Sequence, residues 1–290
     1  MRWQKARRSD NVVDARGRSG RGLRVGGGLG LGGIAVVVVL SLLMGQDPLQ
    51  VLDQLAGEGA GVQPAPTQQV GPPPVADPET EFVRAILGDT EDTWAALFAQ
   101  AGEQYREPRL VLFRQGVNSA CGFASSATGP FYCPGDEQVY LDLSFFQEME
   151  QRFAAAGDFA QAYVIAHEVG HHVQTLLGVS ERIQAARQRG VRLEGDNGLL
   201  VRQELQADCL AGVWAHHAQR RHQWLEPGDL EEALGAANAI GDDRLQQRSS
   251  GQVVPDAFTH GTSEQRVRWF RTGFERGEPG ACDTFGAGSL

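Results

Sequence analysis

The segment from Val25 to Gln46 contains no charged residue, and this feature constrains the organisation of the chain more than any other. A helix of about 20 residues, rising about 1.5 Å per residue, spans a bilayer core of about 30 Å. We therefore expect a transmembrane signal-anchor over residues 25–46. A cleaved signal peptide and a buried core helix are the alternatives. No small-residue cleavage site directly follows Met44, and the flank before the segment is basic.

Charge is distributed unevenly about this segment. Residues 1–24 carry eight basic and two acidic side chains, which gives +6, so the net charge of −10 leaves −16 for the rest of the chain. The basic flank predicts a single-pass protein with a cytoplasmic N-terminus and a periplasmic or otherwise extracytoplasmic remainder. An acidic remainder argues against nucleic acid as a partner, because phosphate binding needs a basic face.

The chain after the apolar segment falls into two parts. Residues 47–76 are rich in Gly, Pro, Gln and Ala, a composition that buries little apolar surface and is typical of a linker. Residues 77–290 are long enough for one globular domain. We therefore predict a basic cytoplasmic tail (1–24), the anchor (25–46), the linker (47–76) and one domain (77–290).

Residues 77–290 show helical patterns, then strand patterns, then helical patterns again, which predicts an α+β fold. Two helices are expected over 79–87 and 91–101, separated at Gly88-Asp89. Two strands are expected over 109–113 and 138–143, joined by a long loop over 115–135. Further helices are expected over 159–177 (with Asp158 as N-cap and Gly178 at the end), 198–221, 229–247 and 262–277.

The chain has four cysteines, an even number in a domain expected outside the cytoplasm, which favours disulfides. Three pairings are possible, and four free buried thiols are the alternative. Cys121 and Cys133 would close a local loop rich in Gly, Ser and Pro. That pairing leaves Cys209 with Cys282, which would tie the C-terminal residues to a helix.

The helix expected over residues 159–177 contains His167-Glu168-Val169-Gly170-His171. Histidines four residues apart lie on one face of a helix, so both can bind one zinc ion. Zinc lowers the pKa of a bound water, and Glu168 follows the first histidine and can take the proton. The alternative, two solvated histidines with a salt-bridging glutamate, is disfavoured by the position of the motif inside a helix with start and stop signals.

A catalytic zinc ion needs a third protein ligand and an open position. Glu204 and Asp208 lie four residues apart on an otherwise apolar helix. One carboxylate can bind zinc while the other accepts the spare N–H of a ligand histidine, and a solvated polar face is the alternative. The candidate donors are His172, His216, His217, His222, His260, Glu204 and Asp208, of which His172 should point away from the His171 face.

At these residues the chain resembles the bacterial family of neutral zinc metallopeptidases. The resemblance is carried by residues 1–3, 9–12, 125–133, 139–142, 167–172, 204–209 and 260–266. It implies a zincin-like domain with a glutamate as third ligand. More distantly, the chain is similar to membrane-linked peptidases that combine His-Glu-x-x-His with Glu-x-x-x-Asp. These similarities imply that three residues bind one Zn²⁺ (His167, His171 and Glu204), that Glu168 is the base, and that Asp208 supports a ligand.

In those distant relatives a Thr-His-Pro segment and a downstream arginine help to hold the substrate and to order the site. Thr259, His260 and Arg266 match this pattern, although Gly261 replaces the proline. The similarity implies a catalytic role for His260 and a supporting role for Arg266. From the sequence alone, a surface histidine just before a helix is an equal alternative for His260.

Peptide substrates of zincins pair in extended form with an edge strand. Val139, Tyr140 and Leu141 belong to the last strand expected before the motif helix, so this strand is the candidate edge. A central structural strand is the alternative.

These features together predict a membrane-anchored zinc metallopeptidase, an endopeptidase rather than an exopeptidase, acting on peptides or proteins. A zinc-binding scaffold that does not cleave and a zinc hydrolase of a non-peptide amide are the alternative functions.

Overall fold

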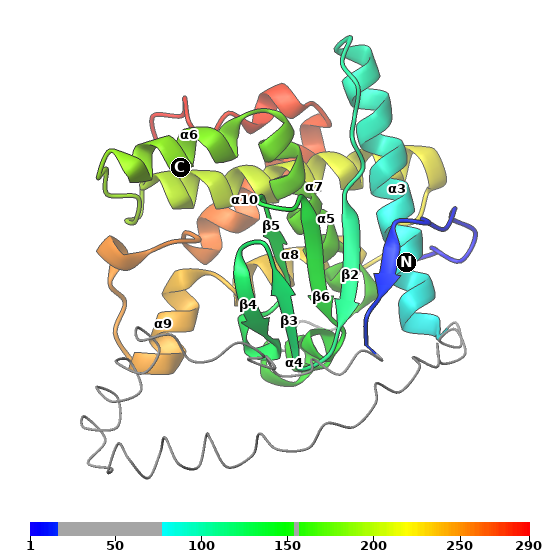
Figure 1. Cartoon of the computed structure of the whole chain (residues 1–290), viewed down its shortest axis with the longest axis horizontal. Helices are drawn as coiled ribbons and strands as arrows, with labels where there is room; N and C mark the ends of the chain where they lie inside the picture. The colour runs from blue at the N-terminus through cyan, green and yellow to red at the C-terminus, as the bar shows by residue number, and fades with distance from the viewer. Residues whose placement is uncertain (17–76, 154–156) are drawn as a thin grey trace, which may run out of the picture. The chain divides into compact units, whose positions relative to one another are not determined.

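The computed structural model describes residues 1–16, 77–153 and 157–290. The predicted span Val25–Gln46 and the predicted linker 47–76 lie outside the described residues. Within the described ranges, no helix combines the length and apolar character needed to cross a membrane. These residues form strands and helices in the α+β arrangement that the sequence predicted (Figure 1).

The described elements include several that the sequence pattern did not indicate. The strands are β1 (Val12–Asp14), β2 (Arg109–Phe113), β3 (Gly116–Ser119), β4 (Gly122–Ser125), β5 (Phe131–Cys133) and β6 (Gln138–Asp142). The α-helices are α3 (Pro78–Gln100), α4 (Ser144–Phe153), α5 (Asp158–Leu176), α6 (Val179–Gln188), α7 (Leu199–His222), α8 (Asp229–Ala239), α9 (Asp242–Ser250) and α10 (Ser263–Arg276). The 3₁₀ turns are η1 (Ser126–Thr128), η2 (Pro255–Ala257) and η3 (Pro279–Cys282).

The larger sheet has the strand order β1-β2-β6-β5, with β1 and β6 parallel to β2 and β5 antiparallel to β6. Alternate residues of each strand face opposite sides. Leu112 of β2 and Leu141 of β6 belong to the main core with the helices. Val111 and Tyr140 belong to a smaller core, to which Val117 of the β3–β4 hairpin also contributes.

The expectation that Val139, Tyr140 and Leu141 form an edge strand is wrong. Tyr140 is opposite Val111 of β2 on one side and Phe131 of β5 on the other, so β6 is a central strand with neighbours on both sides. The strands at the two ends of the sheet are β1 and β5, and β5, the one beside β6, lies in the segment expected to be a loop. Its three residues are too few for a strand pattern to show in the sequence.

Helix α5 packs against α3, α7 and α8 and against the strands β5 and β6. Small residues permit these close contacts. A Cβ on Gly170 of α5 would lie 3.0 Å from the carbonyl oxygen of Ala207 in α7. A Cβ on Gly273 of α10 would lie 1.9 Å from the carbonyl oxygen of Cys209 in α7. Helix α7 is therefore held tightly between α5 and α10.

The predicted break at Gly88-Asp89 does not occur, because α3 is one continuous helix. Gly88 instead permits the N-terminal residues to approach the helix. A Cβ at this position would lie 2.9 Å from the carbonyl oxygen of Arg7, and Nη2 of Arg7 donates to the Gly88 carbonyl at 2.9 Å. The glycine marks a packing contact between distant segments rather than a helix end.

Residues 1–16 belong to the same compact unit as residues 77–290, which differs from their predicted place in a separate tail. Strand β1 extends the sheet beside β2, and α3 lies next to it (Figure 1). Ser9 Oγ and Asn11 Nδ2 donate to Glu91 Oε1 of α3 at 2.6 Å and 2.8 Å. Two arginines of this segment pair with acids of α3, Arg7 with Glu91 at 2.7 Å and Arg8 with Glu81 at 3.0 Å.

Other helix ends differ from the sequence prediction in two places. The helix expected over 229–247 is divided into α8 and α9 at Gly241, where a Cβ would lie 2.4 Å from the backbone nitrogen of Ser263. Asp158 is not the N-cap of α5, because Gly157 occupies that position and Asp158 accepts from the amino group of Met1 at 2.7 Å. The expected helix end at Gly178 and the helices expected over 198–221 and 262–277 are confirmed.

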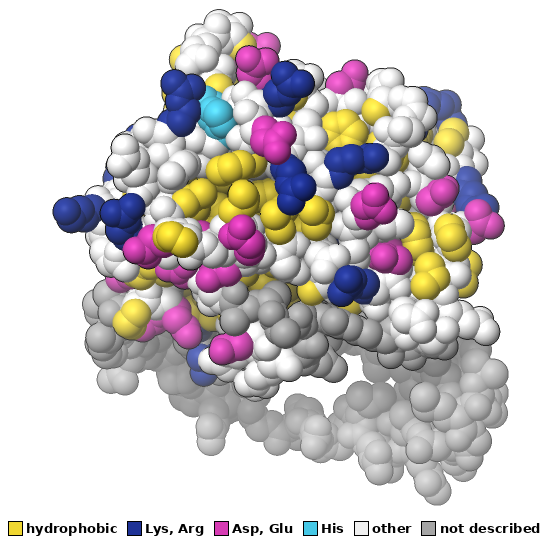
Figure 2. All heavy atoms as spheres, turned by 180° about the vertical axis from the view of Figure 1, so that it is seen from behind, with side chains coloured by type: hydrophobic (Ala, Val, Ile, Leu, Met, Phe, Trp, Pro, Cys, Tyr) yellow, Lys and Arg dark blue, Asp and Glu magenta, His cyan; other side chains and the backbone are white. Residues whose placement is uncertain are grey.

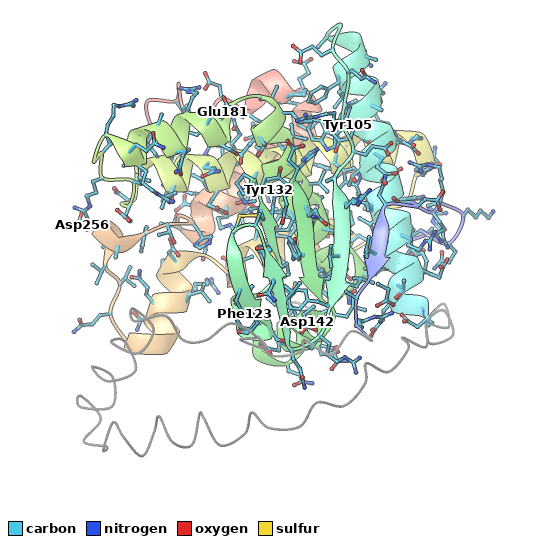
Figure 3. The ribbon with its side chains drawn as sticks, in the orientation of Figure 1. Tyr105, Phe123, Tyr132, Asp142, Glu181 and Asp256 are labelled. Carbon is cyan, nitrogen blue, oxygen red and sulfur yellow. A yellow bond between two sulfur atoms is a disulfide. The ribbon has the colours of Figure 1, made fainter. Side chains whose placement is uncertain are left out.

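Both disulfides have the pairing that the spacing favoured. Cys121–Cys133 links the tip of the β3–β4 hairpin to β5. Cys209–Cys282 ties η3 to α7. At the surface, Phe123 of the hairpin is 72% exposed and is labelled in Figure 3. On the face seen from behind in Figure 2, acidic and basic side chains are interspersed rather than separated by sign.

The contact between α7 and α10 predicts a contrast between two glycines. Gly273→Ala should lower the free energy of unfolding by about 1–3 kcal/mol, because the added methyl overlaps the backbone of α7. Gly235→Ala in α8 is the matched control, since its Cβ meets open space and alanine favours a helix by up to about 1 kcal/mol. Urea unfolding measures both, and equal stability of the two variants would contradict the assigned packing.

Candidate metal centre

Two histidines of α5 and one glutamate of α7 converge at one point. Nε2 of His167 lies 3.2 Å from Oε2 of Glu204, and Nε2 of His171 lies 3.4 Å from the same oxygen. One donor atom from each of the three residues lies within 4.8 Å of the other two. Tetrahedral ligands on bonds of about 2.1 Å are about 3.4 Å apart, so these residues fit a zinc ion with an open fourth position.

The described residues contain one further group of this kind, formed by Asp158, Asp229 and Glu232. The amino group of Met1 lies 2.7 Å from Asp158 and 3.4 Å from Asp229. A cationic partner is therefore already present among these carboxylates.

A buried carboxylate supports the first histidine. Nδ1 of His167 lies 2.8 Å from Oδ1 of Asp208 on α7. Arg266 of α10 donates to both oxygens of Asp208, at 2.8 Å and 2.9 Å, and the hydroxyl of Tyr163 also donates to it. With Asp208 accepting the Nδ1 hydrogen, Nε2 is the ring nitrogen of His167 that faces Glu204 and that can bind a metal ion once it is deprotonated.

The pKa values show a site that favours positive charge. Burial by itself lowers the pKa of His167, but Asp208 and Glu204 outweigh it and raise the pKa to about 10. Burial raises the pKa of Asp208, but Arg266 and His167 outweigh it and lower the pKa to about 2. For Glu204, burial is likewise outweighed by His171 and His167, and the pKa lies well below its usual value. The two carboxylates are therefore anions, suited to a bound cation.

The second histidine has a neutral partner that the sequence did not single out. Nδ1 of His171 lies 2.9 Å from Oε1 of Gln174, three residues further along α5. This spacing places the two side chains on one helix face, which is a signal that the sequence contained.

Glu168 lines a cavity of about 470 Å³ together with the three candidate ligands. Its side chain is largely buried, at 8% exposure. Phe131 and Tyr132 of the edge strand β5 line the same cavity, and Tyr132 is labelled near the middle of Figure 3. The segment between the two cysteines of the first disulfide therefore borders the candidate site.

His260 and Arg266 also reach this cavity but differ in surroundings. The side chain of His260 is 49% exposed, and its Nδ1 lies 3.4 Å from Oδ1 of Asp242. Arg266 is buried against Asp208 and Tyr163. Neither residue belongs to the group of three metal donors.

The other candidate donors have partners elsewhere. His172 faces away from the cavity, as expected, with Nε2 at 2.6 Å from the carbonyl oxygen of Arg106. His216 and His217 contact the carbonyl oxygens of Phe274 and Gly277, and His222 pairs with Asp89.

Sequence comparison places the chain in a class that fits this donor set. Residues 1–285 match the family described as "Putative neutral zinc metallopeptidase", and the chain belongs to this family. It is 49% identical over 290 residues to "Uncharacterized protein YpfJ" of Escherichia coli K12, covering 99% of both chains. It is 44% identical over 219 residues to "Uncharacterized protein Rv2575" of Mycobacterium tuberculosis, covering 72% of this chain and 73% of that one. No solved structure matches the chain.

The geometry predicts different consequences for the two carboxylates of α7. Glu204→Ala should leave the purified protein with little zinc, because one of the three candidate ligands is lost. Asp208→Asn should retain zinc but with an affinity about 10- to 100-fold lower, because Asp208 is the partner of His167 and is not itself a candidate ligand. The same substitution should also lower the free energy of unfolding, because Arg266 loses its buried anionic partner. Elemental analysis and a chelator titration measure zinc binding in both variants. A zinc-free Asp208→Asn protein beside a zinc-loaded Glu204→Ala protein would reverse the assignment.

Proposed function

We propose that this protein is a zinc metallopeptidase that hydrolyses peptide bonds within polypeptides. The observation that carries the proposal is the convergence of His167, His171 and Glu204 at zinc-ligand spacing in a cavity that Glu168 also lines. Family membership supports the same class. The order of the elements, with two ligands on α5, the third on α7 and a strand edge beside the cavity, supports a zincin-like fold.

A zinc ion held by these residues supplies a Lewis acid that polarises the scissile carbonyl and acidifies water. Glu168 is the general base in this proposal. It follows the first ligand on α5 and lines the cavity, so its carboxylate can accept a proton from the attacking water and deliver it to the leaving amine. Asp208 keeps His167 in the tautomer whose Nε2 can bind the ion.

The edge strand β5 is the proposed site for the backbone of the substrate. It pairs with β6 on one side, and in the described part of the chain no strand pairs with its other side. A peptide in extended form can add to such an edge through main-chain hydrogen bonds. An internal stretch of polypeptide fits this arrangement on both sides of the scissile bond, which favours an endopeptidase.

We place the catalytic domain outside the cytoplasm in this proposal. The two disulfides support this location, because disulfides persist in oxidising compartments. Membrane attachment through residues 25–46 stays a prediction from the sequence.

The decisive variant is Glu168→Gln. It should bind zinc like the original protein and lose at least about 100-fold in turnover, because the amide cannot accept the proton. The measurement is cleavage of an unfolded protein by the zinc-loaded enzyme, with and without a chelator, beside elemental analysis. Undiminished turnover by the variant would refute the role of Glu168, and a zinc-loaded original protein that cleaves no polypeptide would refute the peptidase.

A further inference from the structure

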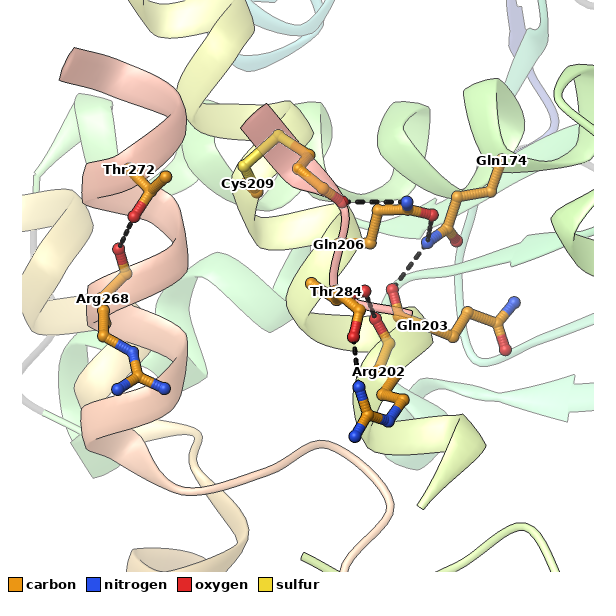
Figure 4. Close-up of a disulfide and its surroundings, with 9 residues drawn as sticks. Gln174, Arg202, Gln203, Gln206, Cys209, Arg268, Thr272 and Thr284 are labelled. Carbon is orange, nitrogen blue, oxygen red and sulfur yellow. Dashed lines mark hydrogen bonds between the residues drawn. A yellow bond between two sulfur atoms is a disulfide. The ribbon is translucent and has the colours of Figure 1, made fainter. Parts of the chain in front are cut away.

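A chain of two side-chain amides, the buried Gln174 and the half-buried Gln206, joins the candidate ligand His171 to the C-terminal residues, and Figure 4 shows most of it. Oε1 of Gln174 faces Nδ1 of His171 at 2.9 Å. Nε2 of Gln174 donates to the carbonyl oxygen of Gln203 at 2.6 Å and to Oε1 of Gln206 at 3.0 Å. Nε2 of Gln206 donates to the carbonyl oxygen of Cys282 at 3.0 Å.

These partners fix the orientation of each amide. The –NH₂ group of Gln174 faces two oxygens, so its own oxygen must face His171. Nδ1 of His171 must then carry a hydrogen, so in the neutral imidazole the lone pair is on Nε2, the atom beside Glu204. The amides therefore select the tautomer in which His171 can bind a metal ion.

The far end of the chain is held by a covalent bond. Cys282 is joined to Cys209, which lies three residues after Gln206 on α7 and therefore on a neighbouring part of the same helix face. Gln174 is 0% exposed, so water cannot easily replace it as the partner of His171. The two histidines thus have different supports, a charged carboxylate for His167 and a neutral amide chain for His171.

We infer that Gln174 and Gln206 are positioning residues that keep the His171 ring in the orientation and tautomer that can bind zinc. The backbone of η3, which Gln206 contacts, fixes the far end of this hydrogen-bonded chain. The inference rests on the proposed zinc function and extends it to residues that touch neither metal nor substrate. Zinc affinity then depends on the C-terminal residues, although none of them is a ligand.

The test is the zinc dissociation constant, measured by competition with a chromophoric chelator. Gln174→Ala should weaken zinc binding about 10- to 100-fold, the usual effect of losing the partner of a ligand histidine. Gln174→Glu keeps an acceptor for the Nδ1 hydrogen, so its affinity should stay close to that of the original protein even if the variant is less stable. If Gln174→Ala does not fold, Gln206→Leu should weaken binding in the same direction by a smaller factor.

Thr284→Val is the matched control. Thr284 is buried in the same C-terminal segment and donates to the carbonyl oxygen of Arg202, outside the amide chain (Figure 4). This variant should melt at a lower temperature with unchanged zinc affinity. Unchanged affinity in Gln174→Ala, or an equal loss in Thr284→Val, would overturn the inference. A protein that binds zinc but cleaves no polypeptide would overturn the proposed function alone.

A second inference comes independently from the N-terminal residues. Nη2 of Arg16 donates to Oδ2 of Asp77 at 2.8 Å and to Oγ1 of Thr80 at 2.7 Å. Residues 16 and 77, far apart in sequence, are therefore neighbours in the fold. Two further contacts join residues 1–16 to the domain. Ser9 donates to Glu91, and both residues are buried, while β1 pairs with β2.

Contacts of this kind form only between segments in one compartment. A single membrane crossing between residues 16 and 77 would separate them. We infer that residues 1–16 and 77–290 lie on the same side of any membrane that the chain meets. This differs from the topology expected from the sequence, in which the N-terminus and the domain lie on opposite sides.

Cysteine labelling in intact cells tests this placement. Lys5→Cys in the N-terminal segment and Arg187→Cys in α6 both introduce an exposed thiol into a chain whose four native cysteines are paired. A membrane-impermeant maleimide should label both variants or neither, with the parent protein as the background. Labelling of one position and protection of the other would overturn the inference.

Discussion

The buried ion pair between Asp208 and Arg266 is the interaction on which the candidate site depends. Asp208 is 0% exposed and Arg266 is 2% exposed. Removing one partner of such a pair costs about 3–5 kcal/mol, because the other charge is left buried alone. The same carboxylate accepts from His167 and Tyr163. The stability of the α7–α10 contact and the tautomer of His167, a candidate zinc ligand, are therefore linked through one side chain.

Helix α7 presents functional side chains to both α5 and α10 because it packs closely against each of them. Its glycine partners, Gly170 on α5 and Gly273 on α10, bring backbones together where a methyl group would intrude. At that separation Glu204 reaches the histidines, and Asp208 reaches both α5 and α10. Precise placement of ligands thus comes from rigid helix packing rather than from loops, as a preorganised site requires.

The sequence predicted the motif helix and two strands because each has a local periodic pattern. It predicted the disulfide pairing because four cysteines allow only three pairings. It missed β5 because three residues among turn formers give no periodic signal. It assigned the basic N-terminal residues to a separate tail because their acidic partners on α3, such as Glu91, are distant in sequence. Gln174 was missed because an amide is not one of the usual zinc ligands, although its spacing from His171 was visible.

The sequence by itself determined that His167 and His171 share a helix face with Glu168 beside them, because helical periodicity fixes the positions of residues three and four apart. It also supplied a carboxylate pair and four cysteines. Only the tertiary structure showed that Glu204 lies beside the two histidines and that Asp208 contacts His167 and Arg266. It also showed that β5, not β6, is the edge strand on this side of the sheet. Those outcomes depend on distances between segments far apart in the chain, which packing sets and local pattern does not.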